Sequence, residues 1–130
     1  MLVLFVEDDA MNRRVVRDML RVVGTIMEEA EEAESGLAML GATPYDMVLM
    51  DLRMPGMDGI QALKALRARG DHTPCVFLTT FDESDLLLRA TEAGAQGFLL
   101  KDAAPEDLHD AIVRAIAGQT LLQPVSTDPV

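Results

Sequence analysis

The segment Met47–Asp51 is the feature that most constrains how this chain can fold. Four apolar residues, Met47–Met50, run without a break and end on the carboxylate of Asp51. An unbroken apolar run is typical of a strand buried on both faces, as in a parallel sheet. Pro55-Gly56 then breaks the chain into a loop, and Asp58 can cap the helix that follows. Asp51 either begins a turn, a common use of aspartate, or stands at the carboxyl end of a buried strand, where open α/β sheets bind ligands.

The whole chain alternates short apolar runs with apolar residues at helical spacing. Because parallel strands need crossover helices, this alternation predicts an α/β fold with a parallel sheet and helices on both faces. The strand that carries Glu28 and Glu29 is the most polar and is predicted at an edge. Ser35 is expected to cap a short helix, and Pro105 suits the first turn of the last helix. The predicted strands are 2–6, 25–30, 47–51, 75–78 and 97–100. The predicted helices are 10–23, 59–69, 83–93 and 105–118, together with a short helix that starts at Ser35 and ends before a loop at 41–44.

Composition and charge exclude several classes of protein. A chain of 130 residues that is 49% hydrophobic fits one globular domain, and no apolar stretch approaches the ~20 residues of a membrane helix. The first residues lack the basic start and cleavage site of a signal peptide, and a lone Cys75 permits no internal disulfide. The net charge of −11 argues against binding to nucleic-acid phosphates. We therefore expect a cytoplasmic domain that binds neither a membrane nor nucleic acid.

Polar side chains follow four of the five predicted strands, at the point where each strand ends. Glu7 and Asp8 follow the first strand, Asp51 ends the third, Thr79 follows the fourth and Lys101 follows the fifth. The carboxyl ends of parallel strands meet at one edge of a sheet. We therefore expect three carboxylates, a hydroxyl and an amine to converge there.

This set of side chains suits phosphoryl chemistry. Crowded carboxylates repel one another unless a cation neutralises them, and an all-oxygen ligand set favours Mg²⁺. A carboxylate can attack phosphorus to form an acyl phosphate, while metal, lysine and hydroxyl stabilise the charge on the phosphoryl oxygens. No GxxxxGK[ST] motif for binding a nucleotide is present. His72 and His109 end no predicted strand and are expected at the surface, with no zinc site.

The motifs that carry these residues resemble the receiver domains of bacterial two-component response regulators, the CheY-like family. The resemblance covers residues 2–118, and it implies a flavodoxin/CheY-like, doubly wound (βα)5 fold with strand order 2-1-3-4-5. It divides the chain into a receiver domain, residues 1–118, and a tail or the start of a linker, residues 119–130. The motifs are Val6-Glu7-Asp8-Asp9, Met50-Asp51-Leu52-Arg53-Met54-Pro55-Gly56-Met57-Asp58-Gly59, Leu78-Thr79-Thr80 and Gly94-Ala95-Gln96-Gly97-Phe98-Leu99-Leu100-Lys101.

The resemblance also implies a role for each residue of the site. Asp51 would be the phosphoacceptor, Thr79 the switch hydroxyl and Lys101 the partner of the phosphoryl group. Phe98 matches the switching aromatic of the family, with an ordinary core residue as the alternative. The implied Mg²⁺ ligands are Asp8 directly, Glu7 mainly through a water, Asp51 and the backbone carbonyl of Arg53, whereas Asp9 falls just past the acidic pair.

Two short segments resemble the NarL/FixJ-like subfamily in particular. These are Leu99-Leu100-Lys101-Asp102 and Thr79-Thr80-Phe81-Asp82. Many receivers have a proline after this lysine, joined to it by a cis peptide bond. In this chain Asp102 follows the lysine, and a cis bond is not expected, because a non-proline cis bond costs about 2.5–4 kcal/mol. The resemblance implies a switch phosphorylated by a sensor histidine kinase, with an output that is transcriptional in most members, through a DNA-binding domain that follows the receiver. Homodimerisation on phosphorylation is a further expectation.

Two other functions remain open at this point. A Mg²⁺-dependent phosphohydrolase with an aspartyl nucleophile usually needs a second acid two residues later, where Arg53 stands. A pseudo-receiver would bind partners without phosphorylation, but it would not need the full set of acids, threonine and lysine. We therefore expect a phosphoacceptor that assists its own phosphorylation and dephosphorylation, not a classical enzyme. Of Leu86, Leu87 and Leu88, at least one should be exposed, because consecutive helix positions cannot all face the core.

Overall fold

The computed structural model describes residues 2–79, 84–101 and 103–119. In these ranges strands and helices alternate along the chain, as the sequence predicts. They are β1 (Leu2–Val6), α1 (Ala10–Val22), β2 (Ile26–Ala30), α2 (Ala33–Ala42), β3 (Met47–Asp51), α3 (Gly59–Ala68), β4 (Cys75–Thr79), α4 (Ser84–Ala93), β5 (Gly97–Leu100) and α5 (Pro105–Ile116).

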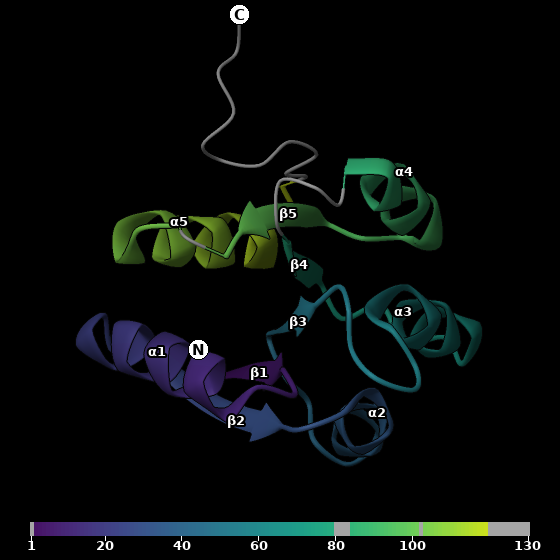
Figure 1. Ribbon diagram of the computed structural model, residues 1–130, viewed down its shortest axis with the longest axis horizontal. Coiled ribbons are helices and arrows are strands. Elements are labelled where there is room, and N and C mark those ends of the chain that lie inside the picture. The colour runs from purple at the N-terminus through teal and green to yellow at the C-terminus, as the bar shows by residue number, and fades with distance from the viewer. Residues whose placement is uncertain (1, 80–83, 102, 120–130) are drawn as a thin grey trace, which may run out of the picture.

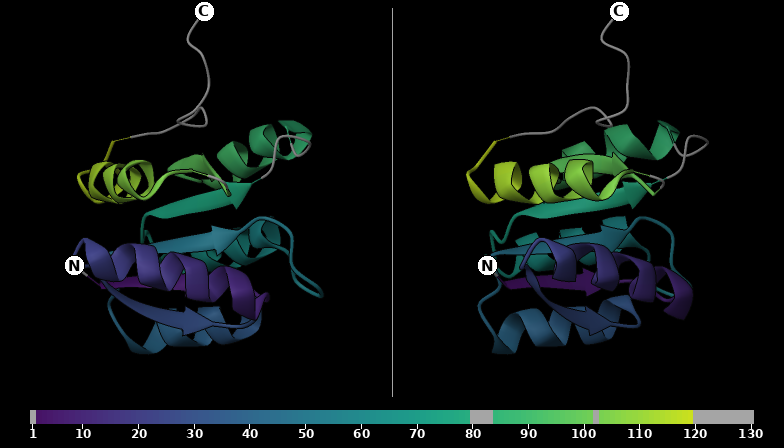
Figure 2. Two further views of the ribbon diagram at one scale, coloured as in Figure 1. Left: turned by 60° about the vertical axis from the view of Figure 1, so that its left-hand side comes forward. Right: turned by 90° about the vertical axis from the view of Figure 1, so that its left-hand side faces the viewer.

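The five strands form one parallel sheet in the order β2-β1-β3-β4-β5, which confirms the implied topology. Figure 2 shows all the strand arrows pointing the same way. The strands are nearly level at their carboxyl ends, since Val6 lies opposite Met50, Asp51 opposite Leu78 and Thr79 opposite Leu100. The residues that end or follow β1, β3, β4 and β5 therefore emerge along one edge. β2 lies at one side of the sheet, as its glutamates predict.

Helices cover both faces of the sheet, with α1 and α5 on one face and α2, α3 and α4 on the other (Figure 1). Alternate residues of each strand point to opposite faces of the sheet and contribute to two hydrophobic cores, one on each face. Val3, Phe5 and Leu49 pack on the side of α1 and α5, whereas Leu4 and Met50 pack on the side of the other three helices. β3 and β4 are buried over their full length, which explains their continuous apolar runs.

Four predictions about helix ends can be compared with the structure. Asp58 caps α3 and forms a reciprocal capping box with Gln61, and Pro105 occupies the first turn of α5, so both predictions are confirmed. The prediction that Ser35 caps the second helix is wrong. α2 begins at Ala33, and the Ser35 hydroxyl lies inside the helix, where it donates to the Glu32 carbonyl at 2.9 Å. The helix also continues to Ala42, into the segment expected to be a loop.

Leu88 is 68% exposed on α4, which confirms that the leucine triplet cannot all be buried. Leu86 and Leu87 are half-buried and pack against the core. The expectations about the helix start at residue 83, the peptide bond between Lys101 and Asp102, and the tail beyond residue 119 concern positions outside the described residues. In the part of the chain that is described, no helix combines the length and apolar character needed to cross a bilayer.

Candidate phosphoryl and metal site

The ends of β1 and β3 bring three carboxylates together. Oxygen atoms of Glu7, Asp8 and Asp51 all lie within 4.8 Å of one another. Glu7 is 1% exposed and Asp51 is 2% exposed, whereas Asp8 is open to solvent. The structure thus brings together the three acids that the sequence selected, and Asp51 is far more enclosed than an aspartate that merely begins a turn.

Lys101 reaches this acidic cluster from the end of β5. Its ammonium Nζ lies 3.0 Å from Asp51 Oδ1 and 4.0 Å from Glu7 Oε1. The backbone N–H of Lys101 donates to the Thr79 carbonyl at 2.9 Å, which fixes where the side chain starts. The lysine supplies a compact positive charge at the place where negative charge would accumulate on a phosphoryl group bound to Asp51.

Burial and crowding change the acidity of Glu7. Loss of hydration on burial is the largest cause, followed by a hydrogen bond and charge repulsion from Asp51, and together they raise the pKa of Glu7 to about 8. The charge of Lys101 acts in the opposite direction. Without a cation, Glu7 therefore holds a proton at neutral pH.

The cluster fits a divalent cation by the chemistry of its donors. All three side chains offer carboxylate oxygens, which are the ligands that Mg²⁺ prefers. One acid at the solvent side also leaves room for the waters that Mg²⁺ usually keeps. Arg53 is exposed in the loop after β3, beside the cluster in sequence.

Thr79 lies on β4, the strand next to that of Asp51, and Phe98 lies on β5, one strand further along the sheet. Thr79 is the last residue of β4 and is 1% exposed, and it pairs with Leu100, the residue before Lys101. Phe98 is 1% exposed and lies opposite Phe77 in the core that faces α2, α3 and α4. The hydroxyl therefore lies at the same edge as Asp51, while the aromatic ring is a packed core side chain.

Gly59 allows α3 to begin directly beneath Asp51. A Cβ at this position would lie 2.7 Å from the Asp51 carbonyl oxygen and 2.7 Å from Phe77 Cε1, both closer than such contacts allow. The Gly59 N–H donates to the Leu52 carbonyl at 3.0 Å. A residue without a side chain thus lets the helix pack tightly against the strand end that carries Asp51.

The first turn of α1 supplies contacts that the sequence did not reveal. The Asp9 side chain caps α1 by accepting from the N–H groups of Met11 and Asn12, so Asp9 stays outside the acidic cluster as expected. Asn12 Nδ2 lies 3.3 Å from Glu7 Oε1, and Arg13 donates to the Glu7 carbonyl at 2.7 Å. The five-residue separation of Glu7 and Asn12 matches neither the helix period nor the strand period, so the sequence pattern did not predict this contact.

Neither histidine belongs to this site. His72 is exposed in the loop before β4, as predicted. His109 is half-buried on α5, so the prediction that it lies at the surface is only partly right. Within the described residues, the one cluster of possible metal ligands is the acidic one at the sheet edge.

Comparison with known proteins points to one family. The model of the response regulator receiver domain matches residues 3–113. The transcriptional regulatory protein YdfI of Bacillus subtilis is 41% identical over 100 residues, which cover 77% of this chain and 46% of that protein. The nitrate/nitrite response regulator protein NarL of Escherichia coli (strain K12) is 32% identical over 127 residues, covering 96% of this chain and 59% of NarL.

The fold gives the same result. The crystal structure named FixJ-N superposes with a TM-score of 0.85 at 28% identity, covering 89% of this chain and 93% of that one. The chain spans about half the length of the curated relatives it matches, 46% of YdfI and 59% of NarL. Family members are signalling domains of two-component systems that typically use Mg²⁺. On the extent of the family match, the chain belongs to the response regulator receiver domain family.

Proposed function

We propose that Asp51 accepts a phosphoryl group from a sensor histidine kinase and that this modification switches the domain. The observation that carries the proposal is the placement of Asp51, which is buried at the central strand end, joined to two other acids, and paired with Lys101 at 3.0 Å. One oxygen of its carboxylate would attack phosphorus while the bond to the donor's nitrogen breaks. Asp51 would thereby become an acyl phosphate.

The neighbouring residues have separate parts in this proposal. Asp8 would contact Mg²⁺ directly, Glu7 mainly through a water, and Asp51 and the Arg53 carbonyl would complete the protein ligands. The bound ion would neutralise charge on the phosphoryl oxygens. Lys101 would form an ion pair with the phosphoryl group. The same residues would assist hydrolysis of the acyl phosphate, so the domain would limit the lifetime of its own signal.

The switch would consist of movement in the part of the fold next to Thr79. The Thr79 hydroxyl would hydrogen-bond the phosphoryl group, and Phe98 would repack together with α4, β5 and α5. Leu88, exposed on α4, would belong to the surface that changes and could serve a phosphorylation-dependent homodimer. We place the receiver domain at residues 1–118 and regard residues 119–130 as a tail or linker. The name and length of YdfI support a transcriptional output through a part of the protein outside this sequence.

The aspartyl phosphohydrolase is less well supported. Its second acid would stand two residues after the nucleophile, and Arg53 is exposed at that position. Turnover of a generic phosphoester separates the two functions, because we expect the domain to take up one phosphoryl group without catalysing such turnover. Multiple turnover that depends on Asp51 would favour the enzyme.

Incubation with Mg²⁺ and a small acyl-phosphate donor, followed by intact mass measurement, tests the proposal. We expect wild type to gain one phosphoryl group and Asp51→Asn to gain none. Asp18→Asn removes an exposed aspartate on α1 and should behave as wild type. An unchanged phosphoryl yield in Asp51→Asn contradicts the assignment, and no yield in any variant supports a binding module that works without phosphorylation.

A further inference from the structure

Glu7 is held in place by the first turn of α1. The Arg13 guanidinium fixes the Glu7 backbone through its carbonyl at 2.7 Å. The two carboxylate oxygens have different neighbours from α1: the Asp9 N–H lies 3.4 Å from Oε2, and Asn12 Nδ2 lies 3.3 Å from Oε1. Of these, only the Asn12 contact is made by a side chain to the carboxylate, so a substitution can remove it alone.

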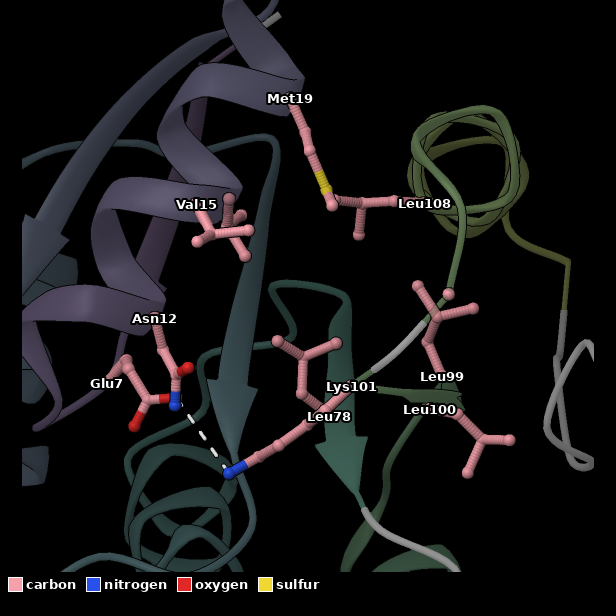
Figure 3. A pocket seen from close by; sticks show the side chains of 11 residues that line it. Glu7, Asn12, Val15, Met19, Leu78, Leu99, Leu100, Lys101 and Leu108 are labelled. Carbon is pink, nitrogen blue, oxygen red and sulfur yellow. Dashed lines mark hydrogen bonds and ion pairs between the residues drawn. The ribbon is translucent and has the colours of Figure 1, made fainter.

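Asn12 lies in surroundings that are mostly apolar. Asn12 lines a hollow between α1 and α5 whose walls are mostly apolar, with Val15, Val16 and Met19 on the same helix. Figure 3 shows Asn12 beside Glu7 at the end of this hollow, with Lys101 reaching toward them from the other side. Asn12 is half-buried, and the buried carboxylate of Glu7 gives its amide a polar partner.

The direction of this hydrogen bond matters for the acidic cluster. With a cation bound Glu7 is ionised, and an ionised carboxylate accepts hydrogen bonds but donates none, so in that state it is the amide N–H₂ that faces Glu7. Glu7 Oε1 lies 3.3 Å from this amide and 4.0 Å from the Lys101 ammonium. The amide hydrogen bond therefore helps to define the orientation of the carboxylate, and the amide does this without adding a charge that would compete with a cation.

We propose that Asn12 is a positioning residue for the metal site: its amide orients the Glu7 carboxylate toward the cation. This inference rests on the Mg²⁺ site of the proposed function and adds a residue to it. Partners that orient metal ligands commonly contribute about 10- to 100-fold to metal affinity. The contact is long, so we expect the lower end, a loss of about tenfold when the amide is removed.

A purely structural role for Asn12 is the alternative, and a double-mutant cycle separates the two. Asn12→Leu keeps the volume and removes the donor, and the apolar wall of the hollow can accept the new side chain. Mg²⁺ dissociation constants would be measured by calorimetry for wild type, Asn12→Leu, Glu7→Gln and the double variant. Met11→Ala, a change at a 69% exposed residue one position earlier, is the matched control, and thermal unfolding without Mg²⁺ shows whether each variant is folded.

We expect Asn12→Leu to weaken Mg²⁺ binding about tenfold in the wild-type background and by less than about twofold in the Glu7→Gln background. Met11→Ala should bind Mg²⁺ as wild type does. Wild-type affinity in a folded Asn12→Leu variant, or an equal loss in both backgrounds, overturns the role of Asn12 while leaving the metal site intact. If wild type itself binds no Mg²⁺, both the metal site and this inference fail. If Asn12→Leu does not fold, Asn12→Ala, which removes the donor without adding a charge, must show the same loss in the wild-type background and not in the Glu7→Gln background.

Discussion

In the absence of Mg²⁺, raising the pH should destabilise the protein through Glu7. The pKa of Glu7 rises from its ordinary 4.5 to about 8 in the folded state. Between these values the folded protein binds a proton that the unfolded chain has lost. The resulting stability is therefore complete below pH 4.5 and disappears as the pH rises through about 8. The difference corresponds to about 5 kcal/mol at most, since each pKa unit is worth about 1.4 kcal/mol. Other titrating groups will reduce the observed change, and we expect at least about 2 kcal/mol between pH 5 and 9.

Urea unfolding at a series of pH values, without and with Mg²⁺, measures this effect. Glu7→Gln is neutral at every pH and should flatten the curve, whereas Glu34→Gln, at an exposed position on α2, should leave it unchanged. Mg²⁺ binding requires the proton to leave, so the stabilisation that Mg²⁺ provides should grow as the pH approaches 8. If wild type and Glu7→Gln lose stability in parallel, the protonated Glu7 inferred from burial and from Asp51 is wrong.

Three further predictions concern the metal, the switch and the packing below the site. Asp8→Ala should weaken Mg²⁺ binding sharply, because a direct ligand and a negative charge are lost, and Glu7→Gln should weaken it less. Equal losses of Mg²⁺ affinity in the two variants, measured by calorimetry, would contradict the different roles of the two acids. Thr79→Ala should accept a phosphoryl group without the amide NMR shift changes expected over residues 86–101, and a full wild-type pattern makes another hydroxyl the switch. Gly59→Ala should cost about 1–3 kcal/mol in urea unfolding, because its Cβ meets atoms at 2.7 Å, and an unchanged midpoint refutes this close packing.

The strong features of the sequence reflect burial on both faces of a sheet. Met47–Met50 and 75–78 read as strands because helices cover them on either side, and such strands allow no polar residue until they end. That abrupt end is what marked Asp51 and Thr79 as candidates. The alternation of elements predicted a parallel sheet. Only the resemblance supplied the order of its strands, because alternation alone is compatible with several orders.

The features that the sequence missed depend on packing between elements. The contact of Asn12 with Glu7 exists because α1 begins at Ala10, just after β1 ends at Val6, and no periodicity in the sequence encodes that contact. α2 starts at Ala33 after Glu32, which makes no capping hydrogen bond, so the more typical capping residue Ser35 misled the prediction. The raised pKa of Glu7 follows from its burial, which the acidic run after β1 could not reveal.

Locating the acyl phosphate tests the central claim most directly. Borohydride reduces an aspartyl phosphate to homoserine, which leaves a stable mark at the modified residue for peptide mass spectrometry. After phosphorylation by a small donor with Mg²⁺, we predict homoserine at Asp51. We predict no homoserine at Asp8 and no 5-hydroxynorvaline, the corresponding reduction product of a glutamyl phosphate, at Glu7, although both carboxylates lie in the same cluster. The mark should be absent when Mg²⁺ is removed and in the Asp51→Asn variant. A homoserine at Asp8, or a stable phosphoryl group that leaves Asp51 unmodified, would contradict the account.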